Sequence, residues 1–218
     1  MITSAKEQIF AIMGKDEGNA YWRASIRCIN DEDLALLREL LDAINALGYK
    51  FSNLHSLTVY EDIRFIPIIL KYIHQNRRCA KSLLYAFHCR AYYQYTPELI
   101  ELYNKGEYSD LRSEISNALL RCRHKKFISQ YLEIVNDSSY GSAPDLVMEI
   151  LCHFKVKEAL PRLLELYERY PDVWRWDLLK YGWYFNDKSI IPYIDPYLTC
   201  DNAEYRCMAR KAIEKISR

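Results

Sequence analysis

Acidic residues recur at a nearly constant spacing along most of the sequence after residue 100. Four of them are separated by 32, 32 and 30 residues, namely Glu101, Glu133, Glu165 and Asp195. If each occupies the same place in a repeated unit, their carboxylates form a row on one surface. Like charges that lie so close repel one another, and a cationic partner relieves the repulsion. Glu98 and Glu168 thicken this row, so the spacing predicts a binding surface for a basic partner.

Aromatic residues accompany the acidic ones. The 218 residues include 19 tyrosines, and a tyrosine packs well while its hydroxyl needs water or a partner, which suits an interface. We expect four aromatic side chains to contact the partner beside the carboxylates: Tyr103, Tyr131, Trp174 and Tyr193.

The sequence contains little evidence for a metal site or for covalent catalysis. Histidine and cysteine lie close together at His88-Cys89, Cys122/His124 and Cys152-His153, but structural zinc normally needs paired ligands such as C-x-x-C, which the chain lacks. The six glycines are isolated, so there is no glycine-rich phosphate loop, and no G-x-S-x-G motif occurs. We expect no metal, no cofactor and no catalytic residue, with the seven cysteines mostly packed as free thiols in a reducing compartment.

The elements that must position these residues are helices. Leu34, Leu37, Leu41 and Ile44 follow helical spacing, as do many later apolar residues, and no convincing alternating segment indicates a strand. The sequence therefore predicts an all-α fold.

Two sets of positions repeat with a period of about 31 residues. The first opens amphipathic segments and consists of Pro67, Pro97, Ser129, Pro161 and Pro192. Proline suits the first helical turn, where its missing N–H would have no partner, so we expect helices to begin near these residues. The second set lies near the start of the alternate helices and consists of Lys81, Arg112, Ala143, Arg175 and Arg206.

A two-helix unit of this length, with I-P-x-x-L in one helix and L-R in the other, resembles the HEAT-like repeats, in the short variety found in phycobilisome-lyase-type proteins. The resemblance covers residues 62–218, and DLRSEISNALLRCRHKKFISQYLEIV is its clearest copy. It implies an α-solenoid of about five to six repeats within one continuous domain, 1–218, in which 1–61 forms a degenerate first repeat or cap. Arg123-His124, Lys155 and Asn186-Asp187 replace the Gly-Asp turn usual in the family.

Charge and hydropathy narrow the classes of partner. Thirty basic and 29 acidic residues leave a net charge of +1, which argues against a nucleic-acid partner because phosphate binding needs a cationic excess. No apolar run reaches 18 residues and the first residues lack a signal-peptide core, so we expect a cytoplasmic protein without a membrane span. The sequence leaves the oligomeric state open.

These observations predict a non-catalytic, protein-binding solenoid. A compact binder with an acidic, tyrosine-rich concave face suits an inhibitor or immunity-type protein that neutralises a basic partner such as a nuclease toxin. An adaptor within a larger complex fits the same features.

An enzymatic alternative comes from the HEAT-like alkylpurine DNA glycosylases. By resemblance, that class frames a concave groove with tryptophans and places an acidic residue beside the damaged base. Trp174, Trp176 and Trp183, with Asp177 or Asp187, are the residues that could serve here, since a carboxylate can stabilise a developing sugar cation.

Overall fold

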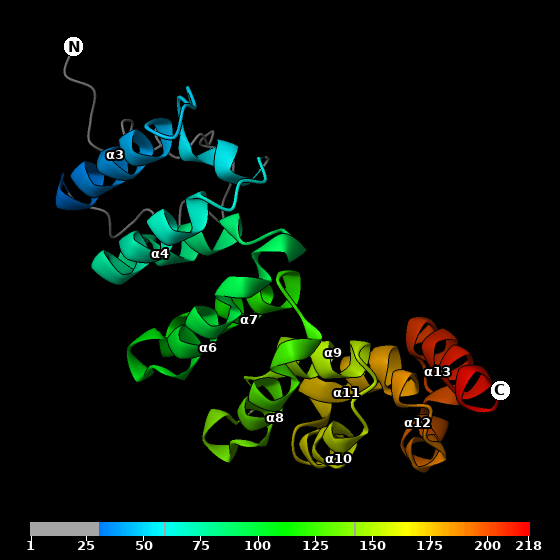
Figure 1. The fold of residues 1–218 in the computed structure, drawn as a ribbon. Coiled ribbons are helices and arrows are strands. Elements are labelled where there is room, and N and C mark those ends of the chain that lie inside the picture. The colour runs from blue at the N-terminus through cyan, green and yellow to red at the C-terminus, as the bar shows by residue number, and fades with distance from the viewer. Residues whose placement is uncertain (1–30, 59, 142) are drawn as a thin grey trace. The chain divides into compact units, whose positions relative to one another are not determined.

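The computed structural model describes residues 31–58, 60–141 and 143–218, and this part of the chain is all-helical (Figure 1). The predicted all-α class is thereby confirmed. The chain forms two compact units, Met1–Cys122 and Arg123–Arg218, which are described separately. A cap within residues 1–61 stays a prediction, because residues 1–30 lie outside the described part of the chain.

The first unit contains helices packed in sequence. They are α3 (Asp31–Asn45), α4 (Phe65–Gln75), α5 (Arg77–Leu83), α6 (Thr96–Asn104) and α7 (Arg112–Arg121). Helix α4 packs between α3 and α5, and α6 packs on α7. An ion pair of 2.7 Å between Lys81 Nζ and Glu114 Oε1 joins α5 to α7.

The second unit has two layers of helices (Figure 1). One layer holds α8 (Ile128–Asn136), α10 (Leu160–Arg169) and α12 (Ile191–Ile194), and the other holds α9 (Asp145–His153), α11 (Pro171–Tyr181) and α13 (Ala203–Ile216). Helix α8 packs on α9 and α10 packs on α11, while α11 also contacts both α9 and α13. The chain passes once through the other layer between consecutive members of a layer.

The predicted helix starts are confirmed. Helices α4, α6, α8, α10 and α12 begin at Phe65, Thr96, Ile128, Leu160 and Ile191, so each predicted proline or serine lies in a first turn. Pro97, Pro161 and Pro192 occupy one of the first two helical positions, where a missing N–H leaves no hydrogen bond unmade.

Two basic residues of the second set, Arg112 and Arg206, connect their helices to the preceding segment. Arg112, the first residue of α7, donates from Nε to the carbonyl of Tyr103 near the end of α6, at 3.3 Å. Arg206 in α13 donates to the carbonyls of Cys200 and Asp201 just before that helix. Arg112 thereby satisfies a carbonyl in the last turn of α6, where the helix dipole favours a positive charge.

A capping hydrogen bond recurs five residues before the repeated proline or serine. The side chains of Asp62, His124 and Asp187 each accept from the backbone N–H two residues ahead, at 2.9, 3.1 and 2.9 Å. Three equivalent positions therefore fold the chain in the same way before a helix, because a short polar side chain can bond the backbone of its own turn.

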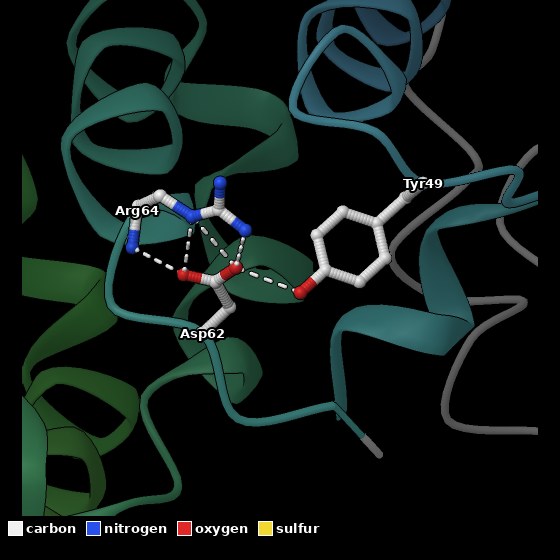
Figure 2. Close-up of polar contacts among 3 residues, drawn as sticks. All are labelled: Tyr49, Asp62 and Arg64. Carbon is white, nitrogen blue, oxygen red and sulfur yellow. Dashed lines mark hydrogen bonds and ion pairs between the residues drawn. The ribbon is translucent and has the colours of Figure 1, made fainter.

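Asp62 makes further bonds in the first unit (Figure 2). Its carboxylate accepts from Tyr49 Oη at 2.7 Å and from Arg64 Nε at 2.9 Å. Arg64 holds the pKa of Asp62 well below its usual range through these charge-assisted bonds. The cluster fixes the segment after α3 against the start of α4.

Two non-glycine residues adopt left-handed backbone conformations at equivalent places. Lys155 has φ +57° and Asn186 has φ +50°, and they lie 31 residues apart between helices of the two layers. These are two of the positions at which the resemblance places a Gly-Asp turn, and glycine is the residue that most readily adopts this conformation.

Each unit has an apolar core, to which the inward faces of its helices contribute. Leu119 of α7 and Leu163 of α10 are both fully buried, each with 0% exposure. Replacing either with alanine removes buried methyl groups and leaves a cavity that the surrounding helices fill only in part.

We therefore expect Leu119→Ala and Leu163→Ala each to lower the free energy of unfolding by about 2–5 kcal/mol. Urea denaturation followed by circular dichroism measures the change. Glu133→Ala, at an exposed position of α8, is the control and should change stability by less than about 0.5 kcal/mol. A loss below about 1 kcal/mol for either leucine would contradict the assigned core.

Candidate functional site

The second unit brings several of the predicted site residues together on one layer. In the first turn of α10, Arg162 donates from Nε to the carbonyl of Val135 in the last turn of α8, at 3.0 Å. In the first turn of α12, Tyr193 donates from its hydroxyl to Glu168 Oε1 in the last turn of α10, at 2.8 Å. Each helix of this layer is thus tied to the one before it, and α8, α10 and α12 lie side by side.

Four carboxylates are exposed along these helices and the turn that continues α12: Glu133, Glu165, Glu168 and Asp195. We call them the acidic row. Glu133 and Glu165 each stand four residues after the repeated serine or proline, so they occupy equivalent positions of neighbouring helices. Arg169 is the exposed basic residue that α10 adds to this surface, and it only partly offsets the negative charge.

Members of the acidic row differ in their local partners. Arg162 NH1 lies 2.7 Å from Glu165 Oε1 and lowers the pKa of that carboxyl mainly through this hydrogen bond. The bond to Glu168 raises the pKa of the Tyr193 hydroxyl, since it disfavours a phenolate beside a carboxylate. Glu133 and Asp195 form no ion pair with any residue in the described part of the chain. They are therefore the carboxylates most available to a partner.

Glu98 and Glu101 lie on α6 and so belong to the first unit. Glu101 is exposed and forms an ion pair with Lys105 at 2.7 Å, which lowers the pKa of its carboxyl. Glu98 is half-buried in the first turn of the same helix. The acidic row belongs to the second unit and therefore does not include these two residues.

The structure corrects the expected role of three aromatic residues. Tyr103, Tyr131 and Trp174 are each 0% exposed, so they belong to the core and present no surface to a partner. For the two tyrosines the reason is helical geometry. Tyr103 and Tyr131 stand two residues from Glu101 and Glu133, and two residues turn a helix by about 200°, which places them on the opposite face.

Tyr193 is the predicted aromatic contact that lies at the surface. It is half-buried, its hydroxyl bonds Glu168, and its ring meets that of Tyr167 edge to face at 6.1 Å. The hydroxyl of Tyr167 lies 2.6 Å from that of Tyr197. These contacts hold the last turn of α10 against α12 and fix the end of the acidic row.

A row of lysines escaped the sequence analysis. Lys125, Lys157 and Lys188 are exposed and each begins the short 3-10 turn that leads into α8, α10 or α12. Their spacing of 32 and 31 residues was the signal that would have revealed them. We call them the lysine row, and they lie at the amino-terminal ends of the helices that carry the acidic row.

Four of the residues considered for base excision, Asp187, Trp174, Trp176 and Trp183, are buried or make local contacts. The Asp187 carboxylate accepts from the backbone N–H of Ser189, which is the main reason for its lowered pKa, with a smaller effect from the charge of Lys157. The rings of Trp183 and Tyr184 stack at 4.0 Å, and Trp176 lies under Lys180 at 5.8 Å. Trp174 is buried, so its ring does not face a groove, whereas Trp176 is exposed and Trp183 is half-buried. The enzymatic alternative stays a prediction.

The histidine–cysteine doublets do not assemble into a ligand set. Among the described residues, no group of three or more histidine, cysteine and acidic side chains is placed to hold a metal ion. Cys122 and Cys152 are buried in the cores of their units, and Cys89, Cys200 and Cys207 are also free thiols.

Comparisons with known proteins give no match: no family model, curated protein or solved structure is significantly similar to the chain. Within the described residues, no helix has both the length and the apolar character that a membrane span needs.

Thiol reactivity tests the assigned positions of the cysteines. Burial raises the pKa of Cys122 to about 12 and raises that of Cys152 well above its ordinary value. Because the thiolate is the reactive form, brief alkylation at pH 8 should modify exposed Cys207 and spare both buried thiols until denaturant is added. Peptide mass spectrometry reads each site, and Cys207→Ser should remove only its own signal. Alkylation of Cys122 in the folded protein as fast as Cys207 would contradict the burial.

Proposed function

We propose that the chain is a HEAT-like repeat protein without a catalytic site, and that it binds a basic protein through the acidic row. One observation carries this proposal: carboxylates at equivalent positions of neighbouring helices are exposed on one surface of the second unit. The repeated helix starts, the recurring capping bond and the two left-handed turns 31 residues apart support the repeat.

The chemistry of the row favours a cationic protein surface. Neighbouring helices pack about 8–10 Å apart, so the carboxylates repel one another and gain stability when lysine or arginine side chains approach. Tyr193 adds an aromatic edge beside Glu168, and tyrosine is enriched where proteins meet. A charged surface of this kind accelerates the encounter with an oppositely charged partner and sets its orientation.

The lysine row makes the charge of this surface asymmetric. Its positive charges lie at one end of the helices whose outer face is acidic, so the charge changes sign along the layer. A basic partner is attracted to the acidic row and repelled from the lysine row, which permits one orientation and disfavours others.

Among protein binders, we infer an inhibitor or immunity-type protein that neutralises a basic enzyme such as a nuclease toxin. An adaptor in a larger complex is the second protein-binding role that fits the same surface. Free thiols at Cys89, Cys122, Cys152, Cys200 and Cys207 support a reducing compartment such as the cytoplasm.

The proposal is tested with a variant that removes negative charge from the acidic row but keeps Glu165, the ion-pair partner of the buried Arg162. Glu133→Gln, Glu168→Gln and Asp195→Asn together leave the Arg162–Glu165 pair intact. This triple variant should fold normally and lose more than tenfold in affinity for the natural partner, about 1.4 kcal/mol. A pull-down from the host at low salt identifies proteins that the wild type retains and the variant loses. Each such protein is then purified, and calorimetry measures its affinity for the wild type and for the variant.

A second triple variant controls for the general effect of changing three charges. Lys125→Gln, Lys157→Gln and Lys188→Gln also change three charges in the same unit, but should preserve or strengthen binding. Added salt should weaken the wild type more than the acidic-row variant, because screening acts on the charges removed. An acidic partner, or equal binding by wild type and acidic-row variant, would refute the proposal.

A further inference from the structure

The first unit contains a pocket that the acidic row does not involve. It lies between α7 and the segment from Leu84 to His88, and its volume is about 180 Å³. Leu84, Phe87 and Ala118 line it with apolar side chains, all of them nearly fully buried. Every residue that lines the pocket precedes Cys122, so the pocket belongs to the first unit alone.

The volume of the pocket suits one ring. A cavity of about 150 Å³ lined by aliphatic and aromatic side chains holds benzene in a well-studied case. This pocket is slightly larger and lies below the range of about 300–1,000 Å³ that is common for drug-sized ligands. An aromatic ring with one or two small polar groups therefore has the right size for this pocket.

The polar edge formed by Asn117 and Arg121 favours a ligand that carries a carboxylate. Asn117 and Arg121 lie four residues apart on α7, on one face of that helix, and both line the pocket. Arg121 is exposed and forms no ion pair within the described part of the chain, so its guanidinium can donate two parallel hydrogen bonds to one carboxylate. Glu114 also lines the pocket, but its charge is offset by Lys81 at 2.7 Å.

A second polar group favours a hydrogen-bond donor on the ligand. Nδ1 of His88 lies 2.9 Å from the carbonyl oxygen of Ala86. Because that oxygen can only accept, Nδ1 carries the proton, and in the neutral ring Nε2 is an acceptor. Nε2 is buried and has no hydrogen-bond partner among the described residues. Nε2 is closed to solvent in this structure, so the His88 ring must rotate slightly toward the pocket before a phenolic hydroxyl satisfies it.

We propose that this pocket binds a small hydroxylated aromatic carboxylate. The ring occupies the apolar space, the carboxylate pairs with Arg121 and Asn117, and the hydroxyl donates to His88 Nε2. The site differs from the proposed protein-binding surface in unit, in size and in the charge that it selects.

A set of three probes separates the contributions. The 3- and 4-hydroxybenzoates carry all three features, benzoate lacks the hydroxyl and phenol lacks the carboxylate. Calorimetry on the full chain should give at least one hydroxybenzoate a dissociation constant of about 1 mM or below. Benzoate and phenol should each bind at least fivefold more weakly.

Two variants assign each group to its residue. Arg121→Gln should weaken hydroxybenzoate at least tenfold and leave phenol within twofold, while His88→Phe should remove the advantage of hydroxybenzoate over benzoate. Arg210→Gln, an exposed arginine in α13 of the second unit, is the matched control and should bind all probes like the wild type. Thermal unfolding of each variant shows that it is folded.

The outcomes are decisive in both directions. Selective loss of the carboxylate probes in Arg121→Gln supports the proposal, as does a chemical-shift change of the His88 ring on titration. Absence of binding up to about 10 mM, equal affinity for phenol and hydroxybenzoate, or a loss that Arg210→Gln shares would overturn it.

Discussion

The short length of its helices is the constraint on which this structure depends. Helices α6, α8 and α9 have nine residues each and α10 has ten, whereas an isolated helix of fewer than about 12 residues is marginal in water. Each helix must therefore gain its stability from neighbours and from well-satisfied ends. The capping bonds of Asp62, His124 and Asp187, and the guanidinium of Arg112 on a helix carbonyl, supply the second requirement.

The same constraint explains why a charged residue is buried inside the second unit. Arg162 is only 8% exposed, and it joins α8 to α10 through the carbonyl of Val135 while it pairs with Glu165. A buried charge is costly unless it is both hydrogen-bonded and paired, and here it is both. Glu165 therefore compensates a structural arginine as well as facing the solvent, so the acidic row is partly a consequence of how the helices are held together.

The two units carry different kinds of candidate binding site. The second unit presents charge of both signs on its surface, with carboxylates along the helices and lysines at their amino-terminal ends, which suits a large partner that approaches from solution. The first unit holds a small, mostly apolar pocket edged by Arg121 and His88, which suits a small molecule. Within the described residues, neither feature contains the ligand cluster of a metal site.

The period of about 31 residues was enough to predict where several helices begin and which of their residues are exposed. The spacing of four prolines and Ser129 determined where α4, α6, α8, α10 and α12 begin, because the first helical turn is the place where proline costs nothing. The spacing of Glu133 and Glu165 determined that both are exposed, because equivalent positions share a helix face. The same rule would have predicted the burial of Tyr131, two residues from Glu133, and the lysine row, had it been applied to every residue type.

The tertiary structure alone decided the contacts between segments that no period relates. The pocket forms because residues 84–88 pack against α7, some 30 residues further along the chain, and nothing in the spacing of His88 and Arg121 indicates that they share a cavity. The burial of Arg162 and its bond to Val135 likewise depend on how α10 lies against α8. A repeat in sequence specifies which face of a helix is turned inward, but the atoms that meet there are set by the packing of side chains in three dimensions.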